Sequence, residues 1–317
     1  MSKAVCAEGE PTESCQMRQD AYQLMSKLQT ASVTDLQMAM DMESEGEAMN
    51  IALTGRFDYE AAVSETSTLG ANVHVWIDEG QMTEAGSTEA LDALEFIVMD
   101  TTGYTSNDGG QTWVSEALDQ DAMSGLGLIL GLGGTSGTGL DMFNDPTTFA
   151  VTAGESVEYN GQMMNVQTLT LDLTGLLSNT EALSAMLTEG LAAGGDVGLD
   201  EEAMGGMTPE DFAMVAAMML PFLEGTEMST TIYIGADDGY IHYVEDHFVL
   251  SMDMSAFDPT QQPVFMNYQL SGYITGHNQP VSIAAPAGAV EGEGVFGEGG
   301  LFGSDSDLGG SLFGTTE

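Results

Sequence analysis

The stretch EFIVMDTTGYTSNDGGQTWVS, residues 95–115, predicts three short antiparallel strands in succession. Its apolar run at residues 96–99 is followed by two polar turns that contain glycine, the second at residues 107–110. Asn, Asp and Gly tolerate the positive φ angles that tight hairpin turns require, so these turns have a steric cause. The stretch therefore predicts a β-meander in which Tyr104 and Trp113 are the large amphipathic side chains.

Segments in which apolar and polar residues alternate recur on both sides of this meander. In residues 34–41, for example, Leu36, Met38 and Met40 share one face and polar residues occupy the other, which is typical of a strand. Sequential hairpins of this kind form antiparallel sheets, and no regular alternation of strands with helices points to a parallel one. The other segments predicted as strands are residues 49–57, 61–69, 72–77, 147–158, 162–173, 228–235, 240–253, 264–275 and 281–284.

Three helices are predicted. Residues 13–28 place apolar side chains on one helical face, with Ser14 as a candidate N-cap. Residues 178–187 begin with a capping-box pattern, and residues 208–220 begin with Thr-Pro-Glu-Asp and continue almost wholly apolar. A helix that is apolar all round is expected to be buried on more than one side. For the glycine-rich residues 124–139, a packed connection is favoured over an adaptable lid.

The order of an apolar strand, Gly103, Tyr104, a polar glycine turn and Trp113 resembles the LolA-like lipoproteins, particularly the LppX and LprG group. The resemblance runs from about residue 16 to residue 286. It implies an α+β fold in which a strongly curved antiparallel sheet, a half-barrel, wraps a few helices around an apolar cavity. Members of that group carry lipids or lipoproteins outside the cytoplasm, so the resemblance also implies an extracytoplasmic location, whether periplasmic, cell-surface or secreted.

The chain is expected to form one folded domain. Its 317 residues, 43% of them hydrophobic, suffice to bury a core. Residues 13–286 are predicted to form a single, monomeric LolA/LppX-like domain, preceded by a disordered arm at residues 1–12. Residues 287–317 are rich in Gly, Ser and acidic residues with repeated Phe-Gly pairs, and are predicted to be a disordered tail.

The charge of the chain excludes several classes of function. There are 50 acidic residues and four basic ones, Lys3, Arg18, Lys27 and Arg56, which gives a net charge of −46. Binding of phosphate, carboxylate or a nucleic-acid backbone usually relies on Arg or Lys, so nucleic acid is excluded as a partner. Anionic membrane surfaces should repel the domain. Salt bridges cannot hold it together, so apolar burial and hydrogen bonds must do so.

Two cysteines, Cys6 and Cys15, lie near the N-terminus. They could pair in an oxidising compartment, or they could remain unpaired in a flexible arm. Residues 1–5 contain no apolar segment of the kind a signal peptide has, and the residues before Cys6 do not match a lipidation motif. Either a signal segment has been removed or there was none, and association with a membrane is expected only through a possible lost lipid anchor.

His242, Glu245 and His247 are ligand types that zinc accepts, but their spacing argues against a joint site. On a strand, His242 would point away from the face shared by Glu245 and His247, so surface histidines are the favoured interpretation. The chain shows no G-x-S-x-G nucleophile elbow and no cysteine next to a histidine. We therefore expect no enzyme activity, no catalytic residues and no cofactor.

The sequence also contains residue types that bind copper or calcium. Met38, Met40 and Met42 share a strand face and could bind Cu(I) through their thioethers. Methionine more often serves as an adaptable apolar lining, since it is unbranched and fills irregular space. Asp305 and Asp307 lie among glycines but lack the ligand spacing of a calcium loop. No resident metal site is predicted.

Together these features predict a passive binding protein that holds a lipid or another apolar small molecule between sheet and helices. The alternatives are a secreted or surface structural protein with the same fold and a filled core, and, third, copper handling through methionine. The residues expected to line the ligand are Leu36, Met38, Met40, Ile51, Leu53, Phe212, Val215 and Met219.

The net charge generates a prediction about salt. Repulsion among carboxylates opposes the compact state, and the screening length falls from about 10 Å at 0.1 M salt to about 3 Å at 1 M. We expect the melting temperature at neutral pH to rise with salt concentration, as for a protein from a saline habitat. An acidic habitat, in which carboxylates are neutral, is the alternative. A series of thermal melts checks this, and a melting temperature independent of salt would contradict it.

Overall fold

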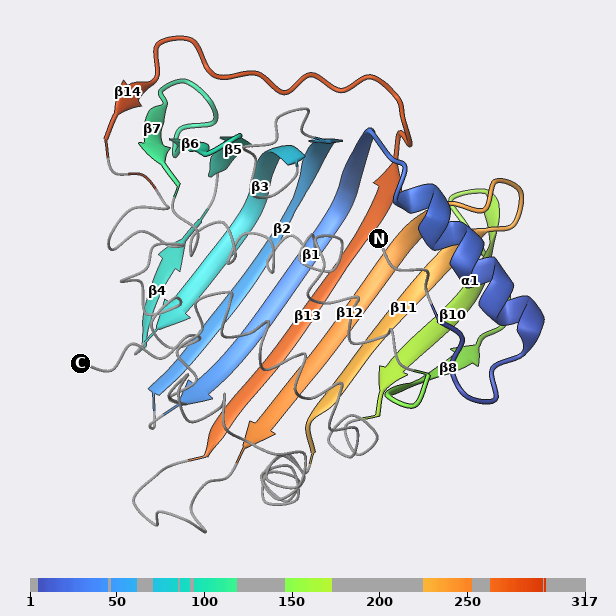
Figure 1. Ribbon diagram of the computed structural model, residues 1–317. Helices are drawn as coiled ribbons and strands as arrows, with labels where there is room; N and C mark the ends of the chain where they lie inside the picture. The colour runs from blue at the N-terminus through green and yellow to red at the C-terminus, as the bar shows by residue number, and fades with distance from the viewer. Residues whose placement is uncertain are drawn as a thin grey trace, which may run out of the picture.

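A computed structural model describes residues 5–44, 47–61, 71–84, 86–91, 94–118, 146–172, 225–252, 263–292 and 294. In these residues the chain forms one α-helix and fourteen β-strands (Figure 1). The helix is α1 (Thr12–Met25), and the strands are β1 (Thr30–Ser44), β2 (Glu47–Ala61), β3 (Ala71–Glu84), β4 (Ser87–Ala90), β5 (Glu95–Met99), β6 (Thr102–Ser106), β7 (Val114–Ala117), β8 (Phe149–Ala153), β9 (Val157–Tyr159), β10 (Gln162–Leu171), β11 (Glu227–Gly235), β12 (Ile241–Met252), β13 (Val264–Thr275) and β14 (Val290–Glu291).

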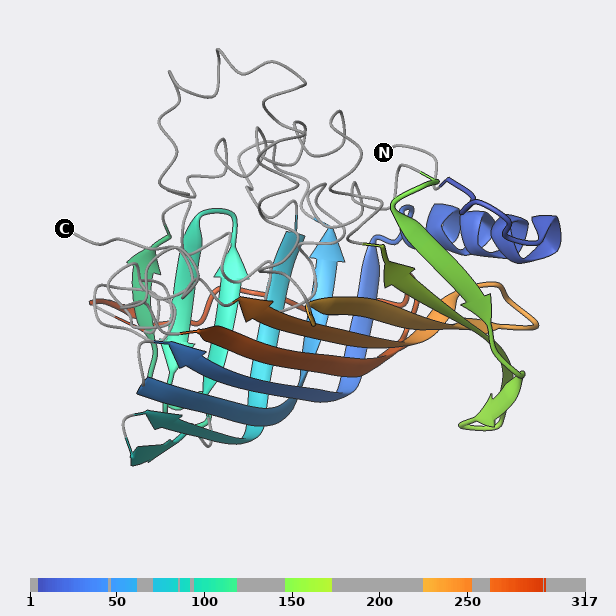
Figure 2. The ribbon, with the colours of Figure 1, turned by 90° about the horizontal axis from the view of Figure 1, so that it is seen from below.

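All the described strands belong to one sheet, in the order β14-β7-β6-β5-β3-β2-β1-β13-β12-β11-β10-β8, with β4 beside β3 and β9 beside β10. Neighbours are antiparallel except where β14 meets β7. Strands β1 and β13 come from opposite ends of the chain yet pair at the centre of the sheet (Figure 1). The sheet is unclosed and curves towards the side that carries α1 (Figure 2). This confirms the predicted large, curved antiparallel sheet.

The meander predicted from residues 95–115 is confirmed, because β5, β6 and β7 pair in series. Its second turn is built on Asp108, whose carboxylate accepts hydrogen bonds from the backbone N–H groups of Gln111 and Thr112, both at 2.9 Å. Gly109 and Gly110 have φ angles of 68° and 82°, the left-handed region that glycine adopts without strain. The Trp113 indole donates to the Gly110 carbonyl at 3.0 Å, which closes the turn.

The long strands have one apolar face and one polar face, as their alternation predicts. Their pairing shifts register between Val33 and Leu36 in β1 and between Thr54 and Gly55 in β2, which is where β-bulges bend a strand. Gly55 is required at this bend, since a Cβ atom there would overlap the backbone carbonyl oxygen of Trp76. The bulges therefore let the paired strands curve together.

Helix α1 packs against the β10–β12 end of the sheet (Figure 1). Ala21, which is fully buried, lies in an apolar cluster with Leu169, Ile232 and Ile234 of the sheet. The helix begins at Thr12, with Pro11 as the N-cap residue and no side-chain cap. Ser14 is therefore not the cap that the sequence predicted.

Residues 5–11 were predicted to belong to a disordered arm, but the structure holds them against α1. A disulfide joins Cys6 to Cys15, with 5.3 Å between their Cα atoms. Arg18 and Glu10 form an ion pair of 2.6 Å in which the two side chains are 1% and 0% exposed. The Arg18 guanidinium also donates to the Val5 carbonyl at 2.9 Å, so the segment is tied to the helix by a covalent bond, a buried ion pair and hydrogen bonds.

The predicted tail also begins with ordered contacts. Strand β14 lies within residues 287–317 and pairs with β7, and the Gly294 N–H donates to the Glu116 carboxylate at 3.1 Å. Outside the described residues lie the segments predicted as helices at residues 178–187 and 208–220, the glycine-rich residues 124–139, and all but the first residue of the strand predicted at residues 61–69. The strand predicted at residues 281–284 is wrong, since these residues form no strand.

The buried ion pair generates a prediction about stability. Arg18→Met leaves the Glu10 carboxylate buried without its partner, which is expected to lower the free energy of unfolding by about 3–5 kcal/mol. Arg56→Met is the matched control, because Arg56 pairs with Asp78 at 2.8 Å where both side chains are about half exposed. That change should cost about 0–1 kcal/mol. Urea unfolding at fixed high salt measures the free energy of unfolding of both variants, and an equal decrease in the two would contradict the prediction.

The Asp108 turn generates a prediction about pH. Hydrogen bonds from the Thr112 backbone, the Thr112 hydroxyl and Ser106 lower the pKa of Asp108 to about 2. Because the pKa is lower in the folded state than in the unfolded chain, the ionised carboxylate contributes stability that is fully present above about pH 4 and is lost as the pH falls towards about 2. The melting-temperature difference between wild type and Asp108→Ala should therefore be constant near neutrality and shrink over that interval. A difference that stays constant down to pH 2 would contradict this assignment.

Candidate functional site

The centre of the apolar face is a row of side chains that crosses several strands. Met38 of β1 stands opposite Leu53 of β2 on one side and opposite Leu270 of β13 on the other. Directly opposed residues of an antiparallel pair project from the same face, so these three side chains adjoin one another. All three are buried and belong to one hydrophobic cluster. The row continues onto β12 with Asp246, which is opposite Leu270.

Two further rows extend the same face towards the other end of the strands. In one, Ile51, Met40 and Tyr268 are opposed across β2, β1 and β13. In the next, Met42 stands between Met49 and Met266, which places three thioether side chains in one row. We call this surface the methionine face. Its members are Leu36, Met38, Met40, Met42, Met49, Ile51, Leu53, Met82, Met266, Tyr268 and Leu270, all of which are in or packed against the same cluster.

The residues that the sequence predicted as ligand-lining divide into two groups. Leu36, Met38, Met40, Ile51 and Leu53 are brought together on the methionine face, where each is at most 7% exposed. That they touch a ligand stays a prediction. Phe212, Val215 and Met219 lie outside the described residues.

A polar group sits within this apolar surface, and sequence reasoning missed it. The Thr230 hydroxyl, opposite on β11, donates a hydrogen bond of 2.7 Å to Oδ1 of Asp246. Burial raises the pKa of Asp246, and the hydrogen bond from Thr230 only partly opposes that effect. Burial also raises the pKa of Tyr268, and the charge of Asp246 adds to this shift. The alternation of β12, which puts Asp246 on the face of Val244 and Phe248, was the signal that could have found it.

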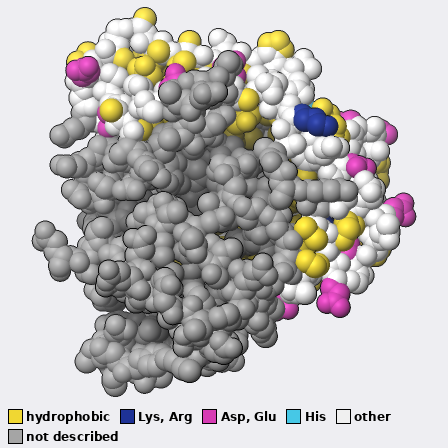
Figure 3. All heavy atoms as spheres, viewed as in Figure 1, with side chains coloured by type: hydrophobic (Ala, Val, Ile, Leu, Met, Phe, Trp, Pro, Cys, Tyr) yellow, Lys and Arg dark blue, Asp and Glu magenta, His cyan; other side chains and the backbone are white. Residues whose placement is uncertain are grey.

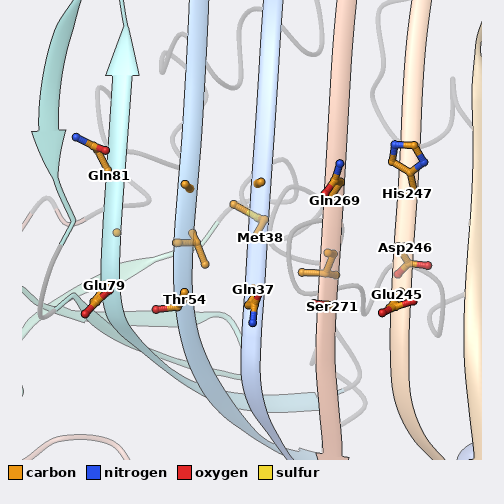
Figure 4. A pocket seen from close by; sticks show the side chains of 15 residues that line it. Gln37, Met38, Thr54, Glu79, Gln81, Glu245, Asp246, His247, Gln269 and Ser271 are labelled. Atoms are coloured by element: carbon orange, nitrogen blue, oxygen red, sulfur yellow. The ribbon is translucent and has the colours of Figure 1, made fainter. Parts of the chain in front are cut away.

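The opposite face of the sheet is polar and carries an open pocket of about 920 Å³ (Figure 4). One row of its lining runs from Glu79 through Gln37 to Glu245, and a second runs from Gln81 through Gln269 to His247. This pocket offers carboxylates, amides and an imidazole to solvent. Ala39, Ala52 and the alternating residues Met38, Leu53, Leu270 and Asp246 also border it. We call this surface the outer face.

His242 lies apart from Glu245 and His247, the other two candidate zinc ligands of this strand. His242 is 7% exposed, so it is not the surface residue that the sequence predicted. Its Nε2 lies 3.0 Å from Asp238, and its ring meets that of His277 edge-on at 4.8 Å. Glu245 and His247 line the pocket of the outer face instead.

Within the described ranges, the three-residue cluster of metal-ligand type is Cys6, Glu10 and Cys15. Its two cysteines are joined in the disulfide, and Glu10 is paired with Arg18. These groups are therefore already engaged with one another.

Acidic side chains are scattered around the described part of the surface in the view of Figure 3, and basic ones are rare there. The two described arginines are both engaged, Arg18 by Glu10 and Arg56 by Asp78. Lys27 is exposed just beyond the end of α1. The methionine face thus contains no cationic side chain among the described residues.

Comparisons with known proteins give structural likenesses only. No protein-family model matches the chain, and no curated protein does. Among solved structures, LprF from Mycobacterium bovis matches with 13% identity and a TM-score of 0.39, over 88% of this chain and 99% of that one. The lipoprotein LppX from Mycobacterium tuberculosis matches with 10% identity and a TM-score of 0.36, over 85% and 97%. A structure of lipovitellin matches with 8% identity and a TM-score of 0.34, over 82% of this chain and 26% of that one.

The first two of these matches are mycobacterial proteins, one of them the LppX lipoprotein that the sequence resembles. At such identities and TM-scores, the likeness says nothing about ligand or role. Among the described residues, no helix is long and apolar enough to cross a membrane.

Proposed function

We propose that this protein is an extracytoplasmic carrier that holds a lipid or another apolar molecule against the methionine face. The observation that carries the proposal is the continuity of that face, whose buried apolar side chains run across β3, β2, β1 and β13. Helix α1 packs on Ile232, which stands opposite Val244 on the same face of the sheet as Asp246, and the sheet curves towards the side that carries α1 (Figure 2). In this proposal the protein is one monomeric domain without catalytic activity, and the domain begins near residue 5 instead of residue 13.

The proposed mechanism is passive. Burial of apolar surface stabilises a complex by about 25 cal/mol per Å², or about 0.8 kcal/mol for each methylene of an acyl chain. Unbranched methionine side chains adjust their rotamers at small cost, so a surface with Met38, Met40, Met42 and Met49 can fit chains of differing shape. The disulfide between Cys6 and Cys15 accords with an oxidising compartment outside the cytoplasm.

The alternative is a secreted or surface protein whose methionine face packs only against its own chain. In that case the same burial would stabilise the fold alone, and no ligand would accompany the purified protein. Binding of Cu(I) through methionine stays a third hypothesis, to which the row of Met42, Met49 and Met266 is relevant.

Native mass spectrometry of protein purified in high salt without detergent tests the proposal. We expect a stoichiometric lipid adduct that organic extraction releases, because an acyl chain bound by apolar burial dissociates slowly in water. An apo mass that ignores added lipid would contradict the carrier and favour the structural alternative. A bound copper ion would appear in the same spectrum by its own mass.

A matched pair of variants locates the ligand. Met40→Trp puts a bulky ring into the methionine face, and we expect ligand occupancy to fall about tenfold, equivalent to roughly 1.4 kcal/mol. Ala39→Trp puts the same ring on the outer face, where Ala39 is exposed, and should leave occupancy unchanged. Thermal melts show whether either variant is destabilised by overpacking. Equal loss in both would place the ligand elsewhere.

A further inference from the structure

The polar group within the methionine face is made by three neighbouring strands. Asp246 of β12 lies between Thr230 of β11 and Leu270 of β13. Tyr268 is one row further along β13 on the same face, opposite Phe248. Asp246 and Tyr268 are therefore diagonal neighbours, a relation in which Cα atoms lie about 7–8 Å apart and long side chains meet.

Two hydrogen-bonding positions of this group are unused among the described residues. The hydroxyl oxygen of Tyr268 is buried and has no hydrogen-bond partner there. Only Oδ1 of Asp246 accepts a hydrogen bond in the described part, from Thr230, which leaves Oδ2 available. Buried polar groups are costly unless they are hydrogen-bonded, so an unpaired hydroxyl beside a carboxyl group calls for a polar partner from outside.

Among the described residues, no Lys or Arg lies at this group to neutralise an anionic partner. Beyond Arg56 the sequence contains neither Lys nor Arg, and Arg18 and Arg56 are held in their own ion pairs. A carboxylate or phosphate placed beside Asp246 would meet a second acidic group in a site of low polarity, where like charges repel strongly. An uncharged head that carries hydroxyl groups would instead satisfy both unused positions.

We propose that the ligand is an uncharged amphiphile whose hydroxyl-bearing head is bound by Asp246 and Tyr268 while its acyl chain lies along the methionine face. This rests on the proposed carrier function and adds the chemical class of the ligand. Met40 and Met38, which lie in the same two rows as Tyr268 and Asp246, are the first apolar side chains that the acyl chain meets.

The hydrogen-bonding capacity of the site fits this assignment. Oδ2 of Asp246 can accept a hydrogen bond from a hydroxyl group of the ligand, and the unpaired Tyr268 phenol can donate one or accept one. Both ends of a hydroxyl group on the ligand can therefore be satisfied.

The test compares two probes that share one acyl chain. Monopalmitoylglycerol is uncharged and carries hydroxyl groups, and palmitate is anionic at pH 7. Displacement of the uncharged dye N-phenyl-1-naphthylamine from the full-length protein measures the affinity of each, below their micelle concentrations. We expect the wild type to bind monopalmitoylglycerol about tenfold more tightly than palmitate, the size that one or two hydrogen bonds supply.

Variants assign the preference to the site. Tyr268→Phe and Asp246→Leu should each reduce the preference to about twofold. Glu245→Gln is the matched control, because it removes a charge from the adjacent residue on the outer face and should change nothing. Tyr268→Phe keeps the test valid if Asp246→Leu fails to fold.

The outcomes separate this inference from the carrier function. Equal binding of both probes by the wild type, or a preference that survives Tyr268→Phe and Asp246→Leu, would overturn the uncharged-head assignment and leave the carrier intact. Failure of the dye and of both probes to bind would overturn the carrier and the assignment together.

Discussion

The pairing of β1 with β13 is the contact on which the rest of the structure depends. It joins segments from opposite ends of the chain, and it puts Met38 beside Leu270 and Met42 beside Met266. Without this seam the sheet would divide into β1 to β7 with β14 on one side and β8 to β13 on the other. The entropy of closing a long loop grows only slowly with its length, so a pairing between distant segments is affordable once an apolar surface is buried along it. The methionine face exists only because the seam is closed.

Apolar burial has to hold this protein together because charge cannot. With a net charge of −46, each added carboxylate raises the repulsion that the compact state must overcome. Among the described residues, one ion pair has both side chains fully buried. It joins Arg18 to Glu10 near the N-terminus of the chain, next to the disulfide. It serves to fasten residues 5–11 to α1, while the cluster that spans the long strands stabilises the sheet.

The two faces of the sheet divide the chemistry of the molecule. The outer face presents carboxylates and amides to water, and the methionine face presents thioethers and branched apolar side chains away from it. Asp246 is the exception on the apolar side, and Thr230 satisfies only part of its carboxyl group in the described residues. An acidic exterior and an apolar face whose described residues include no Lys or Arg together favour a ligand that is apolar along most of its length and uncharged at its head.

The sequence alone was enough to predict the strands, the meander and the shared face of Leu36, Met38 and Met40. It sufficed because side chains alternate along any strand, and because Asn, Asp and Gly in the turn at residues 107–110 have steric preferences of their own. It could not predict that residues 5–11 are fastened by Arg18 and Glu10, nor that Asp246 lies in the row of Met38. The place of Asp246 depends on the hydrogen-bond register between strands far apart in the chain, which no local pattern encodes. The pair of Arg18 and Glu10 depends on how the chain before α1 folds back onto the helix, so in both cases only the tertiary structure decides.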